Sequence, residues 1–393
     1  MIKISKKQIG YSFLTILGVL CFVYICSISR SQLSQQGAKR FSGDGQHYAQ
    51  ISSFFTQDST INESNINNYR SSVQKSLEEA SLKSKYANAR LWVDCYSGKA
   101  KVKVIKGKTT EDVTMIGVGG DFFLFHPMTM LEGYYFSSND VMKDRILIDK
   151  EVAWQLFGST DVVGMNVQVG SKTCVVAGVF ELSEDKATKN AVGKTPMIFA
   201  PFEMLSEGTG SGTAGSGATS AGTADGGTSN GGNSNSAPIR CYEILLPNPV
   251  SGFAKQIILK NVAGVDLTST TSSEIDLDAL KVEILENTNR FSFVRLLETM
   301  KSVGTRSMHT KPMEYPYWEN VARAKEDLAI IFLRLMILIF LFPAIAIVGW
   351  GWRRFKQRKW TLKRLKRVIE EKAEAKKKKK WEEMKYEKEK SIN

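Results

Sequence analysis

The chain has 393 residues, of which 42% are hydrophobic, and a formal net charge of +13, so it can form two or three structural units. The charge is uneven: residues 353–393 contain 18 Lys or Arg and 7 Glu, a local balance of +11. Residues 8–327 are close to neutral. The basicity therefore belongs to the ends of the chain and does not indicate a nucleic-acid partner.

The first predicted element is a membrane helix over residues 9–29, which follows a short cytoplasmic N-terminus, residues 1–8. The segment has no charge and about 20 residues, the length that crosses a bilayer. It is long for a signal peptide, and no small-x-small cleavage site follows it. We therefore expect an uncleaved anchor.

A helical stalk and a first one-sided helix are expected over residues 30–88. The helix is indicated by apolar residues at three- and four-residue steps, Ile66, Tyr69, Val73, Leu77 and Ala80. From residue 89 the period changes to two, and residues 89–206 are expected to form an α+β core. Its first strands are predicted near 91–95, 102–104 and 113–115, with polar turns at 97–98 and 106–107.

The second part of this core reads as a strand at 146–148, a short helix, a loop and a hairpin. Leu156 and Phe157 lie on the apolar side of the helix, and Gly158 follows at the position of a left-handed C-cap. Gly164 then opens a hairpin that turns at Gly170. Backbone angles explain these glycines, so no phosphate-binding loop is needed.

Residues 207–238 are almost wholly Gly, Ser, Thr, Ala and Asn, and we expect a flexible insertion there. Residues 239–326 form the second part of the α+β domain and the membrane-proximal segment. Within them Asn248 and Pro249 predict the start of a helix, followed by a strand at 280–287 and another helix at 292–304.

The second membrane helix is predicted over residues 327–352. Its one charge, Arg334, is expected either to snorkel to the nearer interface or to face a partner helix. Aromatic residues flank the helix and are expected at the two membrane interfaces: Tyr315, Tyr317 and Trp318 outside, Trp350 and Trp352 inside.

A basic cytoplasmic tail, residues 353–393, completes the chain. Together with Lys3, Lys6 and Lys7 it places both termini in the cytoplasm and residues 30–326 outside the bacterial cytoplasmic membrane. The five consecutive lysines at 376–380 favour contact with anionic lipid headgroups, and a merely solvated tail is the alternative.

We find no pattern that predicts catalysis, a cofactor or a metal site. His47, His126 and His309 are far apart and lack the spacing of metal ligands. The segment 192–196 ends like a P-loop but lacks the glycine that the motif requires. The extracytoplasmic cysteines 95, 174 and 241 allow at most one disulfide, and three free thiols are equally compatible with the sequence.

A series of short motifs in a fixed order resembles the periplasmic core domain of MacB-type ABC transporter permeases, relatives of the FtsX and LolC/E group. The series covers residues 118–201. It consists of a Gly-Asp-Phe-Phe step, a strand ending in Leu-Glu-Gly, a helix ending in Leu-Phe-Gly, a Val-Gly corner and a final glycine-containing strand. The residues that carry it are Gly120, Asp121, Phe122, Gly133, Leu156, Phe157, Gly158, Gly164 and Gly178.

The resemblance implies an α+β extracytoplasmic domain between two terminal transmembrane helices, in a non-catalytic subunit moved by a separate ABC ATPase. Such permeases carry three membrane helices after the domain, whereas this sequence has one apolar run there. The difference leaves three alternatives: the chain pairs with a further permease or adaptor subunit, it docks through its basic tail, or it has lost transport. A homo-oligomer is a further option. Two alternatives remain open: a two-helix structural or regulatory protein like the polysaccharide co-polymerases, and an extracytoplasmic sensor.

Overall fold

A computed structural model describes residues 6–43, 46–84, 89–208, 237–265, 281–303, 313–357 and 362–390. The chain divides into two compact units. One is Cys26–Ile330, and the other combines Met1–Ile25 with Ile331–Asn393. The insertion expected at 207–238 lies outside the described residues except at its ends, as does His309.

Within the described residues, ten strands of the first unit form one mixed sheet. Their order is β10-β1-β9-β2-β3-β8-β5-β7-β4, and β6 pairs with β2 and β7. The pairs β3–β8 and β5–β7 are parallel, and the other pairs are antiparallel. The strands are β1 Tyr48–Phe55, β2 Val93–Lys106, β3 Thr109–Gly120, β4 Thr129–Gly133, β5 Arg145–Asp149, β6 Asn166–Val169, β7 Lys172–Glu181, β8 Met197–Pro201, β9 Cys241–Pro247 and β10 Val282–Glu286.

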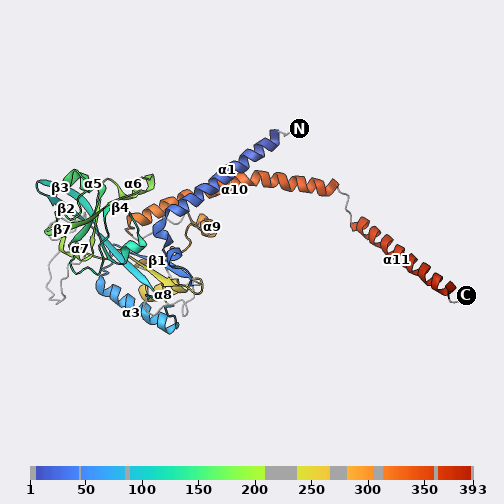
Figure 1. The fold of residues 1–393 in the computed structure, drawn as a ribbon, viewed down its shortest axis with the longest axis horizontal. Coiled ribbons are helices and arrows are strands. Elements are labelled where there is room, and N and C mark those ends of the chain that lie inside the picture. The colour runs from blue at the N-terminus through green and yellow to red at the C-terminus, as the bar shows by residue number, and fades with distance from the viewer. Residues whose placement is uncertain are drawn as a thin grey trace, which may run out of the picture. The chain divides into compact units, whose positions relative to one another are not determined.

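Helices cover both faces of this sheet, as alternating strand residues require. Ile51 and Ile244 pack into one core with residues of α3, α5 and α8, and α3 and α8 lie side by side (Figure 1). Phe54 and Leu245 pack into the other core with residues of α2, α4 and the start of α10. The helices of this unit are η1 Leu33–Gln36, α2 Gly37–Phe41, α3 Glu63–Glu79, α4 Phe122–Phe125, α5 Lys150–Phe157, α6 Lys186–Val192, α7 Glu203–Gly208, α8 Phe253–Val262 and α9 Phe293–Ser302.

The predicted α+β class is confirmed, and several elements lie where the sequence places them. Helix α3 begins at a capping box between Asn62 and Asn65. Gly158 and Gly164 have φ of 71° and 82°, left-handed angles that suit glycine. The predicted hairpin is formed by β6 and β7.

Three predicted details are wrong. No turn breaks β2 at 97–98, because the strand is paired on both sides there, with β3 and β9. Residues 48–55 are not part of a helical stalk: they form β1, a buried strand between β9 and β10. Helix α8 begins at Phe253 rather than at Pro249, although Asn248 still accepts a hydrogen bond from the Ala254 amide at 3.2 Å.

The other unit contains most of α1 (Lys6–Ser31), most of α10 (Tyr317–Gln357) and α11 (Leu362–Lys390). Two helices are long and apolar enough to cross a membrane, Ile9–Ser31 and Tyr317–Lys356. They pack through a small residue, since a Cβ on Gly18 would lie 2.7 Å from the Phe340 ring. Tyr24 contacts Phe332 with ring centroids 4.6 Å apart. Among the described residues, both helices thus have the length and composition of membrane-spanning segments.

Candidate functional site: a buried polar network at the start of helix α10

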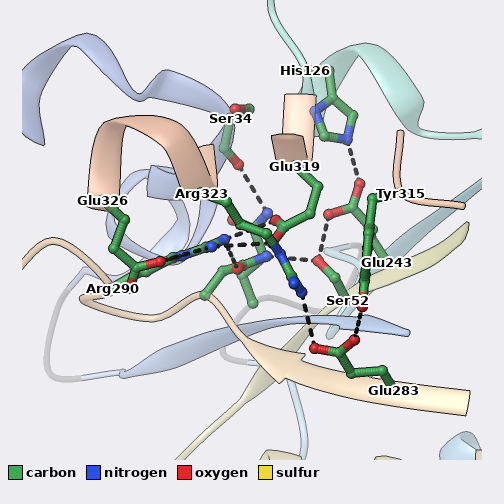
Figure 2. A network of polar contacts seen from close by, with 12 residues as sticks. Ser34, Ser52, His126, Glu243, Glu283, Arg290, Tyr315, Glu319, Arg323 and Glu326 are labelled. Atoms are coloured by element: carbon green, nitrogen blue, oxygen red, sulfur yellow. Dashed lines mark hydrogen bonds and ion pairs between the residues drawn. The ribbon is translucent and has the colours of Figure 1, made fainter. Parts of the chain in front are cut away.

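A chain of buried and partly buried polar side chains joins the sheet to the first turns of α10 (Figure 2). They come from β1, β9, β10, the segments after α4 and β10, and residues 315–326. We call this set the α10 network. Its members are Ser52, His126, Glu243, Glu283, Asn287, Arg290, Tyr315, Glu319, Arg323 and Glu326.

Arg290 is the centre of the α10 network. Its guanidinium donates to both carboxylate oxygens of Glu319, at 2.8 and 3.0 Å, the paired geometry that suits arginine. It also donates to Oε2 of Glu326 from Nε at 3.1 Å and from Nη2 at 3.0 Å. The three side chains are 5%, 1% and 5% exposed. Water therefore does little to screen these contacts.

Helix geometry explains why α10 can hold this set. Glu319, Arg323 and Glu326 are separated by four and three residues, so they share one face of the helix. Arg323 Nε donates to Glu319 Oε1 at 2.7 Å, and its Nη2 donates to Glu283 Oε1 on β10 at 2.9 Å. The Arg323 guanidinium also lies 3.9 Å from the centre of the Tyr315 ring, and the Tyr315 hydroxyl donates to Glu283.

The carboxylates of Glu319 and Glu326 favour the charged form of the Arg290 guanidinium. Burial alone would lower the pKa of Arg290, but attraction by Glu319 and Glu326 raises it above its ordinary value. An ion pair of this kind adds little net stability over an apolar replacement, yet breaking it is costly. It therefore fixes where the start of α10 sits on the domain.

The other end of the network reaches into the sheet. Asn287 Nδ2 donates to Ser52 Oγ at 2.6 Å, and Ser52 Oγ donates to Glu243 Oε1 at 2.5 Å. Glu243 Oε2 contacts His126 Nε2. Burial would raise the pKa of Glu243, but the charge and hydrogen bond of His126, together with the Ser52 bond, lower it. His126 Nδ1 is buried without a hydrogen-bond partner among the described residues.

Three glycines of the family series lie where two backbones approach closely. Gly120 has φ 68°, and a Cβ there would lie 2.5 Å from the Asp94 carbonyl oxygen. Gly133 and Gly178 face each other across β4 and β7. A Cβ on Gly133, whose φ is 75°, would lie 2.2 Å from the Ala177 oxygen. These residues have a packing role.

The other residues of the series have mixed surroundings. Asp121 accepts hydrogen bonds from Arg90 at 2.5 and 3.0 Å, near the surface. Phe122 is buried and contacts both His126 and Trp318. Leu156 is buried, and Phe157 packs against the same core cluster. Of these four residues, Phe122 contacts the α10 network through His126, whereas Asp121, Leu156 and Phe157 have the other partners described above.

The aromatic residues expected outside the membrane lie against the domain instead. Trp318 is 5% exposed, and its ring centroid is 4.4 Å from that of His126. Tyr315 and Tyr317 are partly buried on the same core. The reason is that α10 begins at Tyr317, within the folded unit, and not after it. In the other unit Arg334, Trp350 and Trp352 are exposed.

Sequence reasoning missed Arg290 and Glu243, because their partners are distant in the chain. One signal was available: Glu319, Arg323 and Glu326 repeat on one helical face immediately before an apolar span. A second was Glu243, the single charged residue in the sequence of strand β9, Cys241–Pro247. Charged residues in such places require buried partners.

Comparison with known proteins gives a family. Residues 12–230 match the family described as "MacB-like periplasmic core domain". A stretch of 70 residues is 37% identical to "Macrolide export ATP-binding/permease protein MacB" of Chromobacterium violaceum, covering 17% of this chain and 11% of that protein. The match therefore spans about a tenth of that relative's length.

Two solved structures are similar to the chain at low sequence identity. The extracellular domain of the noncanonic ABC-type transporter YknZ from Gram-positive bacteria is 15% identical, with a TM-score of 0.34, over 55% of this chain and 96% of that one. The periplasmic region of MacB from Actinobacillus actinomycetemcomitans is 11% identical, with a TM-score of 0.38, over 66% and 94%. Because the family match covers more than half of the sequence, the chain belongs to the MacB-like periplasmic core domain family.

Proposed function

We propose that the chain is a non-catalytic, permease-like subunit whose extracytoplasmic domain is moved by a separate ABC ATPase. The observation that supports this most is the continuity of α10. Its 41 residues run without interruption from Tyr317, in the folded unit, through the apolar span to Gln357. A displacement of the apolar part along the helix axis would therefore reach its first turns.

The α10 network supplies the contacts through which a movement of α10 would reach the sheet. Glu319 and Glu326 are held by Arg290, which follows β10, while Arg323 is held by Glu283 on β10 itself. Strand β10 pairs with β1, and Ser52 of β1 continues the network to β9. A shift of α10 would have to move these strands or break buried ion pairs, and breaking one costs about 3–5 kcal/mol.

The proposed orientation places both termini in the cytoplasm. Lysines 3, 6 and 7, which precede the apolar run of α1, and the basic tail after α10 favour this side by the positive-inside bias. Helix α11 carries the five lysines at 376–380, all exposed. We assign to this tail the contacts with anionic lipid headgroups and with the ATPase or a further permease or adaptor subunit.

Affinity purification in mild detergent, with mass spectrometry of the proteins retained, tests this function. We expect an ATP-binding-cassette subunit to be retained in a fixed ratio, and much less of it with a variant that ends at Gln357. Retention of glycan-synthesis proteins without an ATPase would favour the polysaccharide co-polymerase-like alternative. Retention of neither, across several detergents, would contradict the proposal and favour a sensor.

A further inference from the structure

One row of side chains crosses three neighbouring strands on the face of the sheet that α4 and α10 cover. In the strand register Ser52 of β1 is opposite Glu243 of β9, and Glu243 is opposite Cys95 of β2. Directly opposed residues of antiparallel strands point to the same face. His126, which follows α4, lies over this row and contacts Glu243 (Figure 2).

The row brings a thiol, an imidazole and a carboxylate together in the protein core. One ligand atom from each of Cys95, His126 and Glu243 lies within 4.8 Å of the other two. The residues are 1%, 3% and 2% exposed. Thiolate sulfur, imidazole nitrogen and carboxylate oxygen are the three ligand types that bind zinc in proteins.

We propose that Cys95, His126 and Glu243 form a zinc-binding site in the extracytoplasmic domain. Two ionised ligands, the thiolate and the carboxylate, would balance the charge of Zn²⁺, while the imidazole binds in its neutral form. The buried site would then carry no net charge, which limits the cost of burying its ions. Zinc would take the place of the proton between His126 and Glu243, and the thiol proton would leave to solvent.

The surroundings hold these ligands in the way that outer contacts hold known metal ligands. Ser52 donates to Oε1 of Glu243 at 2.5 Å, leaving Oε2 on the side of His126. Asn287 in turn fixes Ser52 at 2.6 Å. The His126 ring is set by Phe122 and Trp318, with ring centroids at 4.7 and 4.4 Å.

Solvent-sized space lies close to the cluster. A cavity of about 130 Å³ is lined in part by Trp318, whose ring rests on His126, and by Cys241, two residues before Glu243 on β9. Three protein ligands leave a fourth zinc position for water or for an incoming ligand.

Metal binding by the full-length chain, purified with a tag that contains no histidine, tests this site. After dialysis against zinc and removal of loosely bound metal, we expect about one zinc per chain. Cobalt loading of the unaltered protein should give the thiolate-to-metal charge-transfer absorption of a sulfur-ligated site. That measurement needs no variant, and its absence would overturn the proposal.

Variants then locate the metal. Cys95→Ala should abolish the charge-transfer band, whereas Cys174→Ala, which removes a buried thiol outside the cluster, should leave it unchanged. Ser52→Ala should weaken zinc binding about 10- to 100-fold while keeping the band. Zinc bound equally well by Cys95→Ala would show that the metal sits elsewhere and would overturn the proposal. None of these results depends on an ATPase, so they are separate from the test of the proposed function.

Discussion

Replacing Arg290 with methionine removes the central cation of the α10 network while keeping a side chain of similar length. Glu319 and Glu326, which are 1% and 5% exposed, would lose their bonds to the guanidinium. Glu319 keeps Arg323 at 2.7 Å, which offsets part of its loss. Glu326 would lose two hydrogen bonds to the guanidinium, at 3.1 and 3.0 Å.

The contact that Glu319 keeps with Arg323 sets the expected cost. Breaking a buried ion pair by removing one partner costs about 3–5 kcal/mol. Because Arg323 compensates Glu319, we expect the lower end, about 3 kcal/mol. For a domain of this size that corresponds to a fall in melting temperature of roughly 6–12 °C. Adding Glu326→Gln should recover part of the loss, since it removes the charge of one of the two carboxylates that Arg290 binds.

Thermal unfolding of the full chain in mild detergent, followed by tryptophan fluorescence, measures this effect. Arg295→Met is the matched control: Arg295 pairs with Glu298 at 3.4 Å, but the two side chains are 44% and 58% exposed. An exposed pair contributes less than about 1 kcal/mol. If Arg290→Met unfolded at the same temperature as Arg295→Met, the network would not hold α10, and the reasoning would be refuted.

Three further predictions concern the backbone, a titrating carboxylate and the topology. Gly133→Ala should destabilise the domain by more than about 2 kcal/mol in denaturant titrations, because it adds a backbone clash to a left-handed angle. Gly158→Ala, whose Cβ would meet open space, should cost about 1 kcal/mol. Equal costs for the two variants would contradict the close backbone approach at Gly133. Burial raises the pKa of Asp149 to about 6, so its protonation stabilises the fold below the unfolded pKa, and this contribution is lost as pH rises towards 6. Asp149→Asn should therefore gain about 1 kcal/mol relative to the wild type between pH 4 and 7, after allowance for partial exposure, and a pH-independent difference in urea midpoints would argue against it. In spheroplasts, an impermeant maleimide should label Val141→Cys, at a 94% exposed position, and should label Lys377→Cys only after lysis; the reverse pattern would invert the proposed orientation.

The features that the sequence predicts well are those that neighbouring residues determine. A charge-free run predicts a membrane helix by its length. Gly158 and Gly164 predict local backbone angles, because each acts within a few residues. The order of the short motifs then indicated the family that the comparison confirms.

The features that the sequence does not predict depend on residues far apart in the chain. Strand β1 carries the polar residues Gln50, Ser52 and Ser53 in its interior, which weakens its apolar pattern. Ser52 is tolerated there because Glu243, 191 residues away, accepts its hydrogen bond. His126 is similarly paired 117 residues along the chain. Spacing rules apply to local ligand sets and cannot detect a cluster assembled by cross-strand register.

The aromatic residues at the start of α10 show the same limit. Tyr315, Tyr317 and Trp318 precede an apolar span, a pattern typical of a membrane interface. Their packing on His126, Phe122 and the sheet depends on α10 starting within the domain. The local sequence pattern could not distinguish aromatic residues at a membrane interface from aromatic residues that pack in the core of the domain.

Hydrogen exchange of the purified complex with its ATPase, measured with and without trapped nucleotide, tests the central claim most directly. If α10 transmits motion to the domain, nucleotide trapping should change exchange in residues 317–326 and in β10, and Arg290→Met should abolish the change in β10 while keeping that in α10. Exchange in the domain that is the same in both nucleotide states would contradict coupling through α10.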